Sequence, residues 1–237
     1  MKIFVAGATG VLGRRLIKQF RERGHSVTAL ARNGKNEATI QSLGGESRNG
    51  DLFHTDFVTQ SAAEMETIAR EAGEHHGFGV GILRCGWFYS ADAAPTRSFG
   101  ENLAARKLPI IGKGDAVWSW LHIDDAASAF VTAAEASRSG LWHVVDNEPV
   151  NAADYLRYFA KRLGALPPRK VPVWLARLLA GSAAVDFLTT STRTSNERFR
   201  KDVGWNPRFP SYREGLDEVL ASWRPENFLR LGAKAAA

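Results

Sequence analysis

Cysteine is almost absent from this 237-residue sequence. Cys85 is the only one, so the chain cannot form an internal disulfide or a cysteine-rich zinc site. We interpret Cys85 as a small buried apolar residue, and such cysteine usage fits a protein of the reducing cytoplasm. His75 and His76 have no further ligand at a metal-binding spacing, so no metal site is expected.

Long hydrophobic runs are missing as well. The most apolar stretch, residues 171–188, contains Arg177 and Asp186 and is too short to cross a bilayer. One amphipathic helix over residues 173–188 is the better interpretation. The first residues lack the basic and apolar regions of a signal peptide, and we expect no integral membrane span.

Acidic residues are scarce in the C-terminal third, whereas the formal net charge of the whole chain is +6. Between Arg157 and Arg213, twelve Lys and Arg residues stand against three Asp and Glu. An excess of this kind attracts anionic partners. The segment has none of the aromatic-interleaved basic motifs of nucleic-acid modules, so we expect solvated helix faces and no nucleic-acid partner.

A regular pattern is present at the amino-terminal end. Residues 3–6 predict a strand, and a glycine-rich turn follows them. Leu12, Leu16 and Phe20 then recur every four residues, which predicts a helix that stops at Gly24. Residues 26–31 predict a second strand. A strand–helix–strand unit of this kind calls for a parallel sheet.

The turn contains glycines at positions suited to a dinucleotide. Gly7 permits the tight turn, Gly10 lets the backbone approach a pyrophosphate, and Gly13 lets the helix pack on the strand. Two residues rather than the usual one separate the first two glycines. The predicted cofactor-binding residues of the turn are Gly7, Thr9, Gly10, Val11, Leu12 and Gly13.

The second strand bears on the choice of cofactor. An NAD site usually has an acid at its end, whereas here Arg32 and Asn33 follow Ala31. An arginine suits the 2′-phosphate of NADP. NADP is therefore expected in preference to NAD, with Arg32 and Asn33 as cofactor residues, although Arg32 is also compatible with being one exposed arginine among many.

The remaining pattern predicts an α/β order with a mostly helical end. A weak edge strand is expected around residues 46–52 and an aromatic loop at 87–89. Further strands are expected at 79–83, 117–123 and 141–145, and helices at 37–43, 61–72, 98–105, 124–135, 151–163, 173–188, 194–203 and 211–223.

The order of these elements predicts two domains. We expect a dinucleotide-binding domain over residues 1–145, in which residues 87–123 contribute to the substrate cleft. A substrate-binding region is expected over residues 146–230, followed by a frayed tail over 231–237.

Five segments together resemble the extended branch of the short-chain dehydrogenase/reductase superfamily, the NAD-dependent epimerases, dehydratases and reductases. They occur in family order at residues 7–13, 50–52, 82–89, 121–125 and 203–207. The resemblance implies a Rossmann-like, doubly wound parallel sheet with a small helical substrate-binding region. It also implies that Asp51 and Leu52 lie along the adenine.

The chain departs from this family at the proton-transferring pair. The family's Tyr-x-x-x-Lys aligns with Val58 and Ala62, and neither side chain can transfer a proton. Tyr89, His122 or water would have to serve instead, although His122 is equally compatible with a structural role.

The chain is also short between Leu52 and Ser61, where the family has two further strands with their helices. A compact variant, a deletion and a faulty gene assembly would each explain the shortage. If the chain is complete there, residues 79–83 would lie beside residues 3–6. The smaller sheet would expose apolar surface that favours a homo-oligomer or instability.

A third departure concerns the substrate. Nucleotide-sugar enzymes of this branch usually have a phosphate-binding arginine where this chain has Trp118. A small apolar or aromatic carbonyl or hydroxyl compound is therefore expected, in a pocket formed by Trp87, Tyr89, Trp118 and the nearby Trp120. These aromatics are equally compatible with a role in the core.

Three functions follow from these features. The first is an NADP-dependent oxidoreductase. The second is a non-catalytic dinucleotide-binding sensor or scaffold, because a protein that keeps the glycine turn but loses the Tyr-Lys pair could still bind the dinucleotide. The third is a truncated relative without a function of its own.

Overall fold

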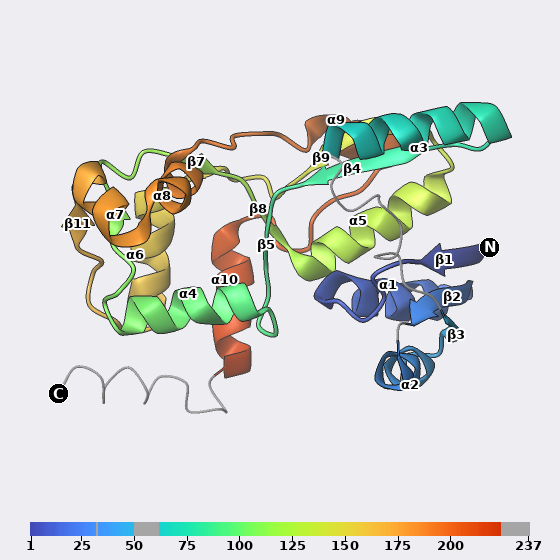
Figure 1. Ribbon diagram of the computed structural model, residues 1–237, viewed down its shortest axis with the longest axis horizontal. Coiled ribbons are helices and arrows are strands. Elements are labelled where there is room, and N and C mark those ends of the chain that lie inside the picture. Colours follow the sequence, from blue (N-terminus) through green and yellow to red (C-terminus); the bar gives the residue numbers. More distant parts are fainter. Residues whose placement is uncertain (32, 50–61, 224–237) are drawn as a thin grey trace. The chain divides into compact units, whose positions relative to one another are not determined.

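The computed structural model describes residues 1–31, 33–49 and 62–223, which form two compact units (Figure 1). Each unit is assembled from separate stretches of the chain. Unit 1 consists of Met1–Arg84, Ile123–Trp142 and Arg198–Trp205, and unit 2 consists of Cys85–His122, His143–Glu197 and Asn206–Ala237. The division of the chain at residue 145 stays a prediction.

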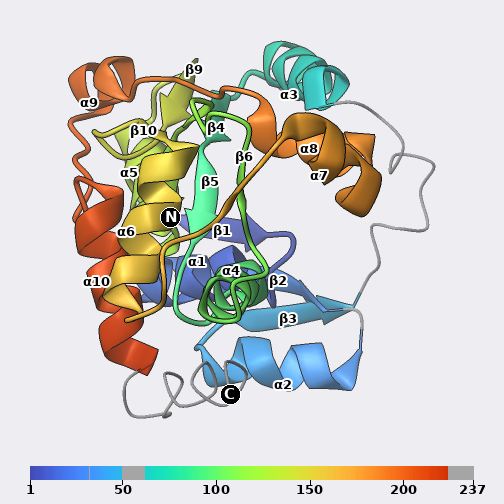
Figure 2. The ribbon, with the colours of Figure 1, turned by 90° about the vertical axis from the view of Figure 1, so that its left-hand side faces the viewer.

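A parallel three-stranded sheet forms the base of unit 1. β1 (Lys2–Val5), β2 (Ser26–Ala31) and β3 (Glu46–Asn49) are neighbours in that order. The crossover helices α1 (Val11–Glu22) and α2 (Gly34–Ser42) pack on these strands (Figure 2). The strand–helix–strand unit and the weak third strand predicted from the sequence are confirmed.

The core of unit 1 follows from the apolar periodicity of these elements. Ile17 and Phe20 of α1 and Val27 and Ala29 of β2 are almost completely buried. The helix α5 (Ile123–Ala136) packs along α1 and adds Val131 to the same cluster. This packing fixes the orientation of α1, and with it the glycine turn that precedes the helix.

Unit 1 also contains α3 (Ala62–His76) and most of β4 (Gly81–Cys85), β9 (Gly140–Val144) and α9 (Glu197–Val203), whose end residues Cys85, 143–144 and Glu197 belong to unit 2. Within the described residues, β4 and β9 form a two-stranded sheet of their own and β1 pairs with β2 alone, so the expectation that residues 79–83 would lie beside residues 3–6 is wrong. The backbone N–H of Gly140 donates to the carbonyl of Val80 at 3.0 Å. This bond lies directly before β4 and adjoins its pairing with β9.

Unit 2 combines short strand pairs with helices. β5 pairs with β8 and β6 with β11 in parallel, and β7 pairs with β10 in antiparallel orientation. The strands are β5 (Trp87–Tyr89), β6 (Ile110–Ile111), β7 (Val117–Trp118), β8 (Trp120–His122), β10 (Val150–Asn151) and β11 (Lys170–Val171). The helices are α4 (Ala94–Ala104), α6 (Ala152–Arg162), α7 (Val173–Ala180), α8 (Ser182–Thr189) and α10 (Tyr212–Trp223).

Three local expectations are corrected. The aromatic segment 87–89 is the strand β5, because its backbone pairs with β8. The single helix expected over 173–188 is broken into α7 and α8 at Gly181, whose φ of 82° does not belong to a helix. The helix expected over 124–135 begins one residue earlier, at Ile123, so Asp124 and Asp125 lie inside the first turn of α5.

Candidate functional site

The glycine turn has the close backbone packing that the sequence predicts. Gly7 has a φ of 72°, in the left-handed region that glycine adopts readily. A Cβ atom on Gly13 would lie 2.2 Å from the carbonyl oxygen of Gly7, and one on Gly10 would lie 3.3 Å from the same oxygen. The turn therefore excludes side chains at both positions, and Gly13 brings α1 against the end of β1.

The start of α1 is open to an anionic ligand. Its N-cap is Gly10, so no side chain caps the first N–H groups, and no acidic residue lies in the first turn. Such N–H groups and the helix dipole favour a phosphate. Gly7 and Gly10 are exposed, whereas Gly13 is buried. This arrangement fits the pyrophosphate of a dinucleotide.

The other predicted cofactor residues follow the carboxyl ends of the parallel strands. Asn33 follows β2, and its side-chain oxygen caps α2 by accepting from the N–H of Asn36 at 3.0 Å. Arg32, Asp51 and Leu52 lie outside the described residues. Their roles toward the cofactor stay predictions.

Unit 2 contains a cavity of about 380 Å³, a size that accommodates a small organic molecule. Its lining is predominantly aromatic and contains no charged side chain. The lining residues are Trp87, Phe88, Pro95, Thr96, Phe99, Trp120, Tyr155 and Phe187. Stacking fixes several of these rings, because Trp120 lies 4.1 Å from Tyr155 and Trp87 lies 4.8 Å from Phe187, centroid to centroid. The structure thus provides a preformed aromatic site.

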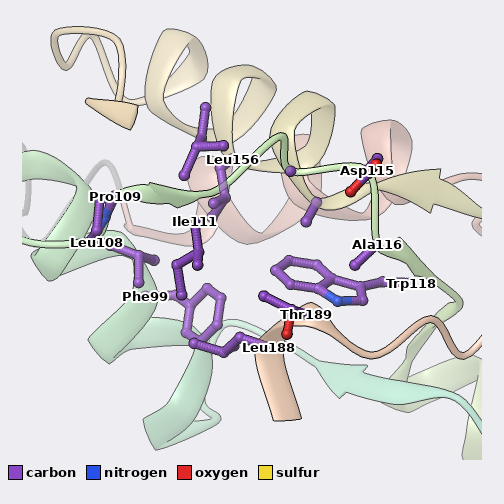
Figure 3. A pocket seen from close by; sticks show the side chains of 13 residues that line it. Phe99, Leu108, Pro109, Ile111, Asp115, Ala116, Trp118, Leu156, Leu188 and Thr189 are labelled. Atoms are coloured by element: carbon purple, nitrogen blue, oxygen red, sulfur yellow. The ribbon is translucent and has the colours of Figure 1, made fainter. Parts of the chain in front are cut away.

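A second and much narrower cavity, of about 30 Å³, lies in the same unit. Phe99, Ile111, Trp118 and Leu188 surround it (Figure 3). Trp118 therefore lines this small cavity and is not among the residues of the larger one. Its ring stacks on that of Trp87 with a centroid distance of 5.1 Å.

Tyr89 and His122, the proposed proton donors, are brought together by the pairing of β5 with β8. Their rings lie 5.2 Å apart, and each residue is only 1% exposed. Nε2 of His122 is 3.4 Å from the carboxylate of Glu218. A Cβ atom on Gly215 would lie 1.9 Å from the hydroxyl of Tyr89, so that hydroxyl packs tightly against α10. Neither residue lines the aromatic cavity.

Burial raises the pKa of two tyrosines and of the cysteine in unit 2. It raises the pKa of Tyr155 well above its ordinary value, and the negative charge of Asp146 raises it further. Burial also raises the pKa of Tyr212 and of the Cys85 thiol to about 12. These groups stay protonated at neutral pH and can donate hydrogen bonds, but they are poor bases or nucleophiles.

Sequence reasoning missed most of the cavity. It named Trp87 and Trp120, but most of the other side chains come from three separate helices that no local pattern relates. These are Pro95, Thr96 and Phe99 of α4, Tyr155 of α6 and Phe187 of α8. Trp120 lies two positions from Trp118, and residues two positions apart along an extended chain point to the same side. Of the aligned Tyr-Lys positions, Val58 lies outside the described residues and Ala62 is the first residue of α3.

The parallel sheet and the open glycine turn define a dinucleotide-binding α/β protein. Residues 3–65 and 60–146 match the NAD dependent epimerase/dehydratase family, and the chain belongs to this family. The two matched stretches meet in the region where the sequence is short. None of the helices in the described part of the chain is long and apolar enough to cross a membrane.

The relatives agree with this assignment. A 3-diazoavenalumate denitrifying reductase from a Streptomyces species is 29% identical, over 91% of this chain and 99% of the relative. The alignment covers 302 positions, more than the 237 residues of this chain, so the chain lacks positions that the relative has.

Solved structures show the same Rossmann-like fold at low identity. The human epimerase family protein SDR39U1 (isoform 2), solved with NADPH, is 17% identical with a TM-score of 0.67, over 93% of this chain and 99% of the other. PA4631 from Pseudomonas aeruginosa, described as a nucleoside-diphosphate-sugar epimerase, is 15% identical with a TM-score of 0.76, over 96% and 99%.

Proposed function

We propose that this protein is a dinucleotide-dependent oxidoreductase, with NADP preferred to NAD, that acts on a small aromatic carbonyl or hydroxyl compound. The observation that carries the proposal is the open turn at the start of α1, where Gly7, Gly10 and Gly13 leave the helix N-terminus accessible. When bound, the cofactor supplies the reducing equivalents for carbonyl chemistry. The single cysteine supports a cytoplasmic location.

The proposal gives each group of residues a separate role in binding the cofactor and the substrate. The turn residues and the N–H groups of α1 would hold the pyrophosphate, and Arg32 would receive the 2′-phosphate. Asn33, Asp51 and Leu52 complete the proposed cofactor site. The aromatic cavity of unit 2 would orient the substrate. Tyr89 and His122 are buried in the core and do not line that cavity, which favours water over either side chain as the proton source.

Thermal unfolding with NADPH or NADH tests this proposal, because a ligand that binds only the native state raises the midpoint. We expect NADPH to raise the midpoint more than NADH at equal concentration. Arg32→Ala should remove the difference and leave the NADH shift unchanged. Glu22→Gln, an exposed change on the surface of α1, serves as the control. If neither nucleotide shifts the transition of the wild-type protein, the proposal fails.

A non-catalytic sensor or scaffold is the second candidate. The positions of the two candidate proton donors favour it, because Tyr89 and His122 are buried and neither side chain lines the aromatic cavity. A screen of aromatic aldehydes and ketones with NADPH separates the two candidates. Reproducible turnover supports the oxidoreductase, whereas nucleotide binding without any turnover supports the sensor.

A further inference from the structure

Two successive helices of unit 2 expose large apolar side chains to solvent. α7 and α8 lie side by side (Figures 1 and 2), and each of them buries a single residue, Ala176 and Val185 respectively. Trp174, Leu178 and Leu179 are 69%, 76% and 75% exposed. We call the exposed apolar set the α7–α8 patch, and it consists of Val173, Trp174, Leu178, Leu179 and Phe187.

The geometry of the two helices gathers these side chains. Trp174 and Leu178 are four residues apart, which places them on the same face of α7. Arg177 of α7 donates to the carboxylate of Asp186 in α8 at 2.7 Å, and this ion pair joins the two helices. Large exposed apolar patches on a folded protein mark sites that contact another molecule or a membrane.

The charges near the α7–α8 patch are predominantly positive. Asp186 is the only acid between residues 155 and 196, and it pairs with Arg177. Lys and Arg occupy seven positions in the same stretch. Two of these residues, Arg169 and Lys170, are exposed and come just before α7. An apolar surface with basic residues beside it is complementary to a partner that is both apolar and anionic.

An anionic lipid bilayer combines these two properties. Its acyl chains accept apolar side chains, and its headgroup phosphates attract Lys and Arg. The side chain of Trp174 suits the boundary between the two regions, because its ring is apolar and its N–H is polar. A second copy of this chain fits less well, because a symmetric contact would bring the same basic residues toward one another.

We propose that the α7–α8 patch binds to the surface of an anionic lipid bilayer. The apolar side chains would enter the outer part of the acyl-chain region, and Arg169 and Lys170 would lie among the headgroup phosphates. Each helix has 8 residues, so both would lie in the interface without crossing the bilayer. This inference goes beyond the proposed function, because it requires neither a nucleotide nor a substrate.

Flotation of the full chain with lipid vesicles tests the inference. One set of vesicles contains phosphatidylcholine alone, and the other contains phosphatidylserine as well. We expect the protein to bind the second set at least roughly tenfold more tightly, because each basic residue near the surface contributes a factor of about five. Added salt should weaken this preference, because it screens the attraction.

The double variant Leu178→Ser, Leu179→Ser tests the apolar contact. Its affinity for the anionic vesicles should fall by at least about tenfold. Its thermal midpoint should not change, since exposed side chains contribute little to folding. Phe78→Ser, at a 53% exposed residue of unit 1, is the matched control and should bind as the wild type does. Phe187 stays unchanged in this series, because it also lines the aromatic cavity.

Lys170→Gln tests the electrostatic contact. It should weaken binding to the anionic vesicles by a factor of about five and leave binding to phosphatidylcholine unchanged. Lys18→Gln, at an exposed lysine of α1, makes the same change in net charge and should have no effect. Equal losses in the two variants would show that binding follows the net charge of the chain, which would overturn the inference.

Three further results would also overturn it. The wild-type protein could float with neither set of vesicles, it could float equally with both, or the double variant could bind as the wild type does. If the patch holds a second copy instead, vesicles will not bind and the double variant will have a lower mass in light scattering. Vesicle binding is measured without nucleotide, so a failure of NADPH to stabilise the protein would leave the result intact.

Discussion

At the scale of single residues, Gly13 determines whether α1 can approach β1. The carbonyl oxygen of Gly7 and the backbone of Ala8 occupy the space that a side chain at position 13 would need. The same close approach places the open N-terminus of α1 at the turn. The proposed cofactor binding and the packing of unit 1 would therefore depend on the same missing Cβ.

Gly13→Ala tests this dependence. A Cβ atom only 2.2 Å from a backbone oxygen forces the turn to move, at a cost of about 1–3 kcal/mol in the free energy of unfolding. We expect the midpoint shift with NADPH to disappear as well. Gly34→Ala is the matched control, since nothing lies within 4 Å of a Cβ atom there. A Gly13→Ala protein with normal stability and a normal NADPH shift would contradict this account.

At the scale of elements, the contact between β8 and α10 contains an ionisable pair. A hydrogen bond with His122 lowers the pKa of Glu218 below its ordinary value, and the charge of Arg208 contributes. A carboxyl with a lowered pKa in the folded state stabilises the protein above its ordinary pKa of 4.5. This stabilisation is lost as the pH falls through the lowered folded pKa.

Glu218→Gln should therefore destabilise the protein at about pH 7, by about 1 kcal/mol or less because the carboxylate is partly exposed to solvent. As the pH falls below 4.5 and through the lowered folded-state pKa, the difference between variant and wild type should shrink, because the wild-type carboxyl becomes protonated too. Chemical denaturation at several pH values measures both effects. Glu22→Gln, at an exposed pair with Lys18, should show neither. If the difference in the free energy of unfolding between variant and wild type were the same at every pH, the lost stability would come from packing and not from the charge of Glu218.

Elements also show how far the sequence could predict the structure. β1, α1 and β2 were predictable because apolar periodicity and glycine positions are local signals. The break at Gly181 also has a local signal, since glycine commonly ends a helix, but the apolar residues that continue on both sides of it favoured a single helix. The pairing of β4 with β9 joins segments far apart in the sequence, and so does the aromatic cavity. Neither follows from any local pattern.

At the scale of the whole molecule, the short chain leaves β1 at the edge of the described sheet. β1 pairs with β2 and with no other strand in the part of the chain that the structure describes. Phe4 in this strand is 61% exposed. An edge strand with an exposed aromatic side chain favours association between copies of the chain.

We therefore predict that the protein self-associates through the β1 edge. Size-exclusion chromatography with light scattering should show a concentration-dependent mass above that of one chain. Phe4→Ser should shift the distribution toward the monomer with little loss of stability, since an exposed side chain contributes little to folding. Leu166→Ser, at a leucine that is 58% exposed in unit 2, should leave the mass unchanged. A wild-type protein that is a stable monomer at all concentrations would show that the shortened sheet needs no partner.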